Sequence, residues 1–474
     1  MERTSDRAEQ RAAASIGSRW AAALPAIAGA ASVLLAARML LERHRFPGKL
    51  SFFGHCVAPA LVGVALWAAI LLRPALRGRL SALVLSVLIA LFGAEIVIRN
   101  AVPAEHPDIA ERSRRALAAG IRFDKRTQFE KANDLRREGE RAFPMHASGT
   151  VMEQAEGGRW RSAIAIDGRE VLPLGGVARA RTMLGNETGV QPDFTSDELG
   201  FNNPPGLWDK APIDVLLTGD SFTLGWGVAP EKNFAAPIRA RFARTVNLGV
   251  TGAGPLAELG QLREFGPVLK PKVTVLFFYE GNDLRDLNRE KASQLAQYLD
   301  PAFSQGLHER RAEVDRALAA YGDAQLARID GLLFRAVQVL ALKRVRALAG
   351  FASPPLDGTG PADWPLFKRA IHEIKAAPAA WGGKLLFVFL PKWSRFARTE
   401  DPRVLERDRE RVLAVVKAEG IPVLDVVDVF QASGDPLDAF PYRLHGHYSE
   451  RGYRLVGDAV VSRLAEGDLA ITPP

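Results

Sequence analysis

The N-terminal region contains three long apolar stretches, and these constrain the fold more than any other feature. Residues 20–37, 51–72 and 80–98 are almost entirely apolar. Each stretch is close to the ~20 residues that a membrane-spanning helix needs. Arginines flank the stretches, and Trp20 lies at the edge of the first one, where interfacial aromatic residues are common. We therefore expect a tail of residues 1–19 followed by three transmembrane helices within residues 20–98.

Two other interpretations of this region are open. The first stretch is also typical of a cleaved signal peptide, but two further stretches follow it directly, which favours a retained helix. All three could instead form a buried helical core. Runs this long and this poor in charge are unusual for such a core, and Glu95 is the one charged residue inside them. A membrane-attached chain remains the preferred interpretation.

The positive charge of the chain belongs to the membrane flanks. The formal net charge is +8, and residues 1–99 carry 12 Lys/Arg against 5 Asp/Glu, which leaves +1 for the rest. This distribution argues against a nucleic-acid partner, which would require a basic groove. Lys/Arg number 7 on the tail side of the membrane and 8 on the other, but Arg112, Arg114 and Arg115 lie farther from the spans. We expect the tail inside and the large domain in the extracytoplasmic, periplasmic space.

Two regions follow the membrane segment. Residues 99–149 show a charged helical pattern that indicates a solvated connector, and residues 150–474 form the main domain. Short apolar runs in this domain alternate with helical stretches, which favours a parallel sheet covered on both faces. The core is expected at 212–465, with a helical insertion at 289–350 that is either a lid or a structural cover. The five apolar runs are residues 213–219, 244–249, 272–281, 384–391 and 421–430.

Polar and glycine residues follow the predicted strands at the edge where ligands bind in open α/β sheets. Ser221 follows the first strand, as a nucleophile or as a helix N-cap. A glycine-rich loop with Gly252 follows the second, as an oxyanion site or a plain turn. Asn282 follows the third, as an amide donor or a turn former. His447 precedes a helix that begins near Glu450, and it is either a general base or structural.

Taken in order, these residues supply a nucleophile, oxyanion donors and a base, which is the inventory that acyl transfer requires. The stretches "GDSFTLGWGV", "NLGVTGAGP", "YEGNDL" and "HYSERGY" resemble the four blocks of the SGNH (GDSL-type) hydrolases. "TSDELGFNNP" looks like a segment that precedes the first block in membrane-attached bacterial members, and we expect it to have a packing role. The resemblance implies a flavodoxin-like three-layer α/β/α domain. It also implies Ser221 as nucleophile, His447 as base, and an oxyanion hole formed by Ser221, Gly252 and Asn282.

One position departs from the family pattern. SGNH hydrolases usually place an aspartate two or three residues before the histidine, where this chain has His445 and Leu444. That aspartate orients the imidazole and stabilises its charged form. A carboxylate from elsewhere can take its place, the site can operate as a Ser–His dyad, or the domain can be inactive. The upstream candidates for a substitute carboxylate are Asp425, Asp428, Asp435 and Asp438.

The resemblance implies a membrane-anchored serine esterase or O-acyltransferase that acts on acyl esters of a carbohydrate or envelope polymer. It implies no cofactor and no metal. The alternative is a catalytically inactive binding or scaffold subunit of a polysaccharide-modifying system, and the missing aspartate favours this alternative.

Overall fold

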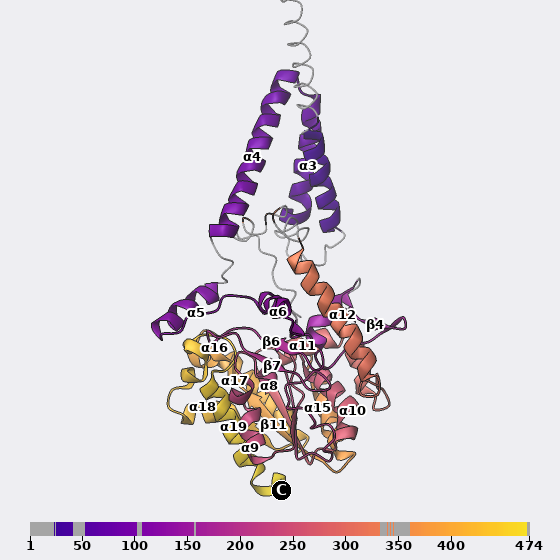
Figure 1. The fold of residues 1–474 in the computed structure, drawn as a ribbon, viewed down its shortest axis with the longest axis vertical. Helices are drawn as coiled ribbons and strands as arrows, with labels where there is room; N and C mark the ends of the chain where they lie inside the picture. The colour runs from indigo at the N-terminus through magenta and orange to yellow at the C-terminus, as the bar shows by residue number, and fades with distance from the viewer. Residues whose placement is uncertain are drawn as a thin grey trace, which may run out of the picture. The chain divides into compact units, whose positions relative to one another are not determined.

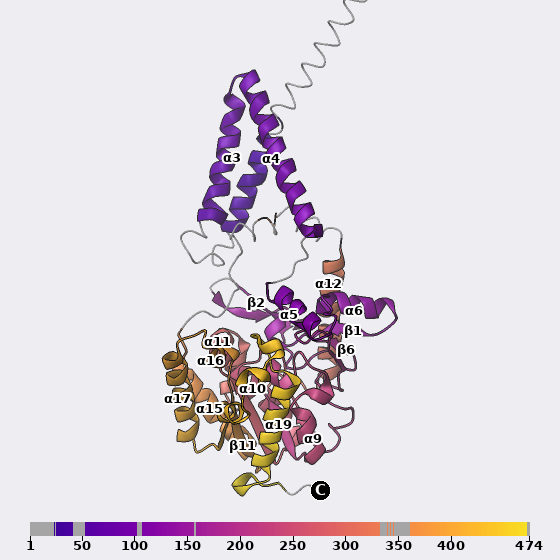
Figure 2. The same cartoon turned by 90° about the vertical axis from the view of Figure 1, so that its left-hand side faces the viewer.

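The computed structural model describes residues 23, 25–40, 53–101, 107–155, 158–331, 339, 342, 345 and 361–471. The chain divides into two compact units (Figures 1 and 2). One unit comprises residues 1–104 and 330–356, and the other comprises residues 105–329 and 357–474. The tail of residues 1–19 and the start of the expected first and second spans lie outside the described residues.

The described part of the first unit consists of apolar helices. A helix covers residues 25–40, and α3 (Ala58–Ala68) lies between a π-helical turn, η2 (Phe53–Val57), and a 3-10 turn, η3 (Ala69–Leu71). Helix α4 (Pro74–Ala101) is the longest. Among the described residues, one helix, Ala75–Ile98 within α4, is long and apolar enough to cross a membrane, with a mean hydropathy of 2.4. The other two apolar helices are shorter, at Pro25–Leu40 and Pro59–Leu71.

The second unit is built on a parallel sheet of five strands in the order β12-β11-β10-β8-β9. In chain order this arrangement is 5-4-3-1-2, which is the flavodoxin-like order read from the other edge. All five expected apolar runs contribute a strand. The last run differs in its second half, because the chain turns into helix α18 (Val426–Ala432) after only three strand residues. The strands are β8 (Val215–Thr218), β9 (Thr245–Asn247), β10 (Val273–Tyr279), β11 (Lys384–Leu390) and β12 (Val423–Asp425).

Apolar side chains cover both faces of this sheet, as expected from the continuous apolar runs. In β10, Val275 and Phe277 belong to one buried cluster, while Leu276 and Phe278 belong to the other. Figure 1 shows α9, α18 and α19 to the left of β11, and α10 and α15 to its right. These helices span Ala235–Arg241 (α9), Pro255–Leu269 (α10), Trp364–Ala379 (α15) and Glu450–Leu464 (α19). Helix α17 (Pro402–Ala418) packs on α15.

Residues 107–195 also belong to the second unit, and they include most of the segment 99–149 that was expected to be a connector. Arg112 on α5 (Pro107–Ala118) and Leu135 on α6 (Gln128–Arg137) are buried. Short strands then form small sheets: β1-β6-β7, β2-β3 and β4-β5. Their bounds are β1 Ala142–Pro144, β2 Met152–Gln154, β3 Trp160–Ser162, β4 Ala165–Ile166, β5 Arg169–Glu170, β6 Arg181–Met183 and β7 Asp193–Thr195. Helix α7 (Ser148–Val151) precedes β2.

Residues 289–329 of the expected insertion pack against the body of this unit. Residues 294–299 form a 3-10 helix, η6 (Gln294–Leu299), and α12 covers Arg311–Asp330. Tyr298 of η6 is fully buried and donates a hydrogen bond to Glu264 of α10 at 2.7 Å. Asp323 of α12 pairs with Arg136 of α6. These contacts favour a structural cover for residues 289–331, while most of 332–350 lies outside the described residues.

Candidate active site

Ser221 lies at the carboxyl end of β8, on a sharp strand-to-helix turn. Asp220 caps α8 (Ser221–Leu224) by accepting a hydrogen bond from Phe222 N at 2.9 Å. The capping role therefore falls to Asp220, and Ser221 is the first helical residue. Gly225 ends this short helix in the left-handed region, at φ +90°, where glycine has no steric penalty. The turn leaves the Ser221 hydroxyl available for other contacts.

The segment before the first strand braces this turn. Asn202 Nδ2 donates to Leu224 O at 3.0 Å, at the end of α8. Asn203 Nδ2 donates to Asn247 O at 3.0 Å, and Asn247 Nδ2 donates to Thr223 O at 2.7 Å. All three asparagines are buried, where such bonds are costly to break. The "TSDELGFNNP" stretch thus has a packing role, and the element it holds is the serine turn.

Three side chains form a hydrogen-bonded series across this sheet edge. Ser221 Oγ lies 2.8 Å from His447 Nε2, although the two residues are 226 positions apart in the sequence. His447 Nδ1 lies 2.8 Å from Glu187 Oε1, and His447 N donates to Glu187 Oε2 at 2.7 Å. Ser449 caps α19 at Glu450, as the sequence predicted, and so fixes the backbone beside His447. This is the nucleophile–base–acid geometry of a serine hydrolase.

Glu187 is the carboxylate that the sequence reasoning missed. It lies in a turn closed by Asn186, whose Oδ1 accepts from Thr188 N and Gly189 N at 3.2 and 2.8 Å. Burial favours the protonated carboxyl, but His447 and Arg112 outweigh this effect and lower the pKa of Glu187. The carboxylate therefore stays ionised beside the imidazole.

The four aspartates considered from the sequence have other positions. Asp425 pairs with Arg409 at 2.5 Å and caps α18. Asp435 and Asp438 both pair with Arg443, at 2.7 and 2.6 Å. Asp428 lies in the first turn of α18. A carboxylate from elsewhere does reach His447, but it precedes the serine in the chain and was not among these four.

The expected oxyanion residues are only partly brought together. Asn282 lines the same pocket as Ser221 and His447, and its Nδ2 donates to Asp286 Oδ2 at 2.6 Å. An amide nitrogen has two hydrogens. Burial raises the pKa of the neighbouring Asp220, and hydrogen bonding from the Asn282 side chain partly offsets this effect. Gly252 adopts φ +70°, and its carbonyl accepts from Arg289 Nη2 at 2.9 Å. Gly252 is not among the residues that line the pocket.

The pocket around Ser221 has a volume of about 640 Å³. Phe222 and Tyr279 line it with rings whose centroids are 4.0 Å apart and whose planes are tilted by 31°. Charged and aromatic side chains also line the pocket. The segment after β11 supplies Lys392, Trp393 and Glu400, and Arg285 and His445 come from other segments. No described residue of 289–331 lines this pocket.

Carboxyl groups gather beneath the Asn282 side of the pocket. Asp220, Glu258 and Asp283 are buried, and burial raises the pKa of each. Burial also raises the pKa of Glu290 to about 7, although its oxygens accept from Gly254 N and Leu256 N.

In the part of the chain that the structure describes, no group of three or more His, Cys, Asp or Glu side chains is placed to hold a metal ion.

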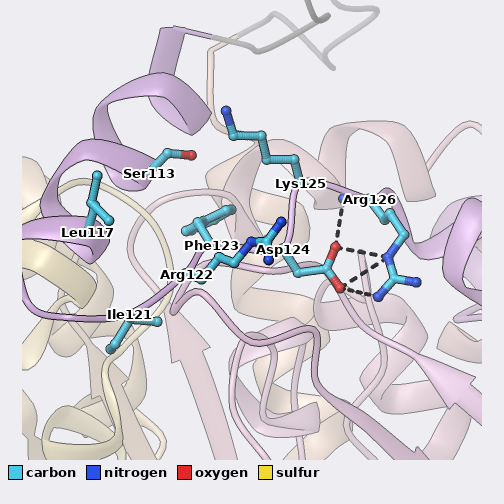
Figure 3. Close-up of a pocket in the computed structure, with 8 residues that line it drawn as sticks. All are labelled: Ser113, Leu117, Ile121, Arg122, Phe123, Asp124, Lys125 and Arg126. Carbon is cyan, nitrogen blue, oxygen red and sulfur yellow. Dashed lines mark hydrogen bonds and ion pairs between the residues drawn. The ribbon is translucent and has the colours of Figure 1, made fainter.

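A second pocket of about 660 Å³ lies along α5 and the chain that follows it (Figure 3). Figure 3 shows the ion pair between Asp124 and Arg126 at one side and Leu117 of α5 at the other. None of the predicted site residues lines this pocket.

Comparisons with known proteins identify the family of this chain. The model of the GDSL-like lipase/acylhydrolase family matches residues 217–455. No curated protein sequence matches the chain. Similar solved structures include a lipase/acylhydrolase from Enterococcus faecalis, with 13% identity, 53% of this chain and 95% of that chain covered, and a TM-score of 0.31. A catalytic mutant of an acetylxylan esterase from Geobacillus stearothermophilus has 10% identity, 55% and 97% coverage, and a TM-score of 0.31.

The family match spans the serine turn, the Asn282 loop and the histidine segment, and it covers half of the chain. It confirms the resemblance drawn from the four sequence blocks. The chain belongs to the GDSL-like lipase/acylhydrolase family.

Proposed function

We propose that the chain is a membrane-anchored serine esterase or O-acyltransferase, with Ser221 as nucleophile and His447 as general base. The observation that carries the proposal is the series Ser221 Oγ–His447 Nε2–Glu187, with both gaps at 2.8 Å. A hydroxyl is a weak nucleophile unless a neighbouring base removes its proton. Glu187 holds the imidazole so that Nδ1 carries the hydrogen and Nε2 is free to accept one.

The reaction proceeds through an acyl-enzyme. Ser221 Oγ attacks the ester carbonyl carbon while its proton passes to His447 Nε2, and the carbonyl oxygen becomes an oxyanion. Collapse of this intermediate expels the alcohol, which takes the proton from His447. Water, or an acceptor hydroxyl in a transferase, then gives its proton to His447 and attacks the acyl carbonyl carbon. Collapse of this second intermediate breaks the bond to Ser221 Oγ and releases the acid or the new ester, and Ser221 Oγ takes the proton back from His447. The nature of the acceptor is what distinguishes hydrolase from transferase.

We assign the oxyanion hole to the Ser221 main-chain N–H and the Asn282 side chain, which both line the pocket. The Gly252 N–H remains a prediction from the family resemblance. The first N–H groups of a helix have no intrahelical partner, so the Ser221 N–H at the start of α8 is available. Asp286 holds the Asn282 amide, and we assign the second amide hydrogen to the oxyanion during the reaction. Donors fixed before the reaction stabilise developing charge without reorganisation.

The pocket supports a polar, hydroxyl-rich leaving group such as a carbohydrate or envelope polymer. Trp393 is held by a hydrogen bond from its Nε1 to Arg443 O at 3.1 Å, and its ring meets His445 edge-on. Lys392 and Glu400 form an ion pair at 2.7 Å at the same site. An aromatic face beside charged hydrogen-bonding groups suits a sugar ring better than an acyl chain.

The nucleophile is tested by labelling the full-length protein in detergent with a fluorophosphonate probe. We expect the wild type to be labelled and the Ser221→Ala variant to remain unlabelled, because the probe reacts with an activated serine. Circular dichroism of both proteins shows that they are folded. A folded wild type that takes up no probe would support the alternative of a non-catalytic binding subunit of a polysaccharide-modifying system.

The membrane part of the proposal has three spans within residues 20–98 and the catalytic domain on the extracytoplasmic, periplasmic side. The catalytic unit then begins before α5, within the segment 99–149 that the sequence analysis expected to be a connector. The apolar helix Ala75–Ile98 supports the third span. At 1.5 Å per residue, Pro25–Leu40 and Pro59–Leu71 fall short of the ~30 Å hydrocarbon core, so these two spans require neighbouring residues as well.

Topology is measured with alkaline phosphatase fusions, since this enzyme folds only where disulfides form. We expect a C-terminal fusion to be active and a fusion after Arg73, which precedes α4, to be inactive. The reverse pattern would place the catalytic domain in the cytoplasm. Equal activity of both fusions would contradict the expected number of spans.

A further inference from the structure

The first helix of the catalytic unit lies directly on the active site. Helix α5 begins at Pro107, six residues after the end of α4. Arg112 and Arg115 are spaced i, i+3 and share one face of the helix. Arg115 Nη1 donates to Tyr442 O at 2.7 Å, and Arg112 Nη2 donates to His445 O. Both arginines therefore bind the loop that leads into His447.

Arg112 also binds the segment that carries the triad acid. Its Nη1 donates to Glu187 O at 3.2 Å and lies 3.7 Å from Glu187 Oε2. The Arg112 side chain is only 5% exposed and that of Glu187 is 16% exposed. A planar guanidinium with several donors can hold two chain segments at once, and a lysine ammonium cannot match that geometry. Arg112 thus joins the Glu187 turn to the histidine loop.

We propose that Arg112 is a positioning residue of the active site, which acts through Glu187 and the His445 carbonyl to hold His447 over Ser221. The inference rests on the proposed function and deepens it. The two carboxylate oxygens of Glu187 contact two different groups of His447: Oε1 contacts Nδ1, and Oε2 accepts a hydrogen bond from the main-chain N–H. The carboxylate can therefore orient His447 only while the main chain at residue 187 keeps its position relative to residue 447. We infer that Arg112 holds these two segments in that position.

Gly446 shows how closely these groups are packed. A Cβ atom at this position would lie 2.4 Å from Glu187 Oε2 and 2.6 Å from Arg112 Nη2. Gly446 also adopts φ +140°, which other residues rarely adopt. The histidine loop thus passes directly over the Arg112–Glu187 pair, with no space for a side chain between them.

The charge of Arg112 supports the same role. A carboxylate this well buried is costly to keep ionised without partners. Burial raises the pKa of Glu187, and His447 together with Arg112 lowers it by more, so Arg112 is one of the two groups that keep the carboxylate ionised.

The test compares full-length Arg112→Met and Arg112→Lys with Arg114→Met, using hydrolysis of p-nitrophenyl acetate. Arg114 lies on the same helix, its side chain is 76% exposed, and it pairs with Glu111, so Arg114→Met is the matched control. We expect kcat to fall at least about tenfold in Arg112→Met, with KM within about twofold of the wild type. Arg112→Lys should recover part of kcat, because lysine restores the positive charge but not the several N–H donors of the planar guanidinium. Arg114→Met should match the wild type.

Loss of a buried arginine can also unfold the protein, so melting temperatures and the fraction labelled by fluorophosphonate are measured on the same samples. The inference is overturned if folded Arg112→Met keeps the kcat of Arg114→Met. It is also overturned if activity falls only in proportion to the folded fraction, or if Arg112→Lys, once folded, is no better than Arg112→Met. A wild type that is not labelled at Ser221 would contradict the proposed function itself, and that result is distinct from these.

Discussion

Replacing Glu187 by glutamine is expected to lower kcat by about 10⁴-fold, which is the loss seen when the orienting acid of a serine protease becomes an amide. The amide can turn its NH₂ group toward His447 Nδ1. The imidazole then carries its hydrogen on Nε2, where it can no longer accept the Ser221 proton. The amide also has no charge with which to stabilise the imidazolium. KM should change little, because Glu187 approaches the reacting atoms only through His447.

The measurement is steady-state hydrolysis of p-nitrophenyl acetate by the full-length protein, with Asp438→Asn as the matched control. Asp438 stands close before His447 in the sequence, but its side chain pairs with Arg443 and is 39% exposed. This control should keep kcat within about twofold, as exposed ion pairs contribute little. A Glu187→Gln variant with wild-type kcat, or an equal loss in Asp438→Asn, would show that another group orients the histidine.

The sheet could be predicted because its strands carry a strong local signal. Runs such as 272–281 and 384–391 are apolar on both faces and bounded by polar residues, glycine or proline, and each became one strand of the parallel sheet. The run 421–430 misled because strand and helix both accept a short apolar segment. There Asp425 accepts a hydrogen bond from Val427 N and caps the start of α18, so the strand ends at Asp425 and the rest of the run is helical.

The serine and histidine could be predicted because strand ends converge at one edge of a parallel sheet. Glu187 could not, because it lies on no element of that sheet. It reaches His447 through packing of the 184–189 turn and α5, and no periodicity encodes such a contact across 260 positions. The one signal was an acid within "GNETG", a turn-forming stretch before the first strand. Arg112 was hidden for a similar reason, since its helix shows the charge pattern of a solvated connector.

Replacing Asn282 by alanine is expected to lower kcat by about 10²–10³-fold, which is the usual cost of removing one oxyanion donor. Asn282 precedes α11 (Asp283–Glu290), but its side chain makes no capping hydrogen bond to that helix. Alanine therefore removes the amide donor without uncapping α11, and the melting temperature should change little. An effect on kcat with a stable fold would separate a catalytic donor from a turn former.

The partner of Asn282 makes this prediction sharper. Asp286 holds the amide at 2.6 Å, so Asp286→Asn should give a smaller loss of kcat than Asn282→Ala, because the donor stays but loses its fixed orientation. Asn288→Ala is the matched control on the same helix, since Asn288 Nδ2 bonds to Pro361 O and Asn288 is not among the residues that line the pocket. If Asn282→Ala hydrolyses p-nitrophenyl acetate as fast as Asn288→Ala, the main-chain N–H groups of Ser221 and Gly252 suffice, and Asn282 is a turn former. If kcat falls more in Asp286→Asn than in Asn282→Ala, Asp286 stabilises the fold of the pocket and does not act only by orienting the Asn282 amide.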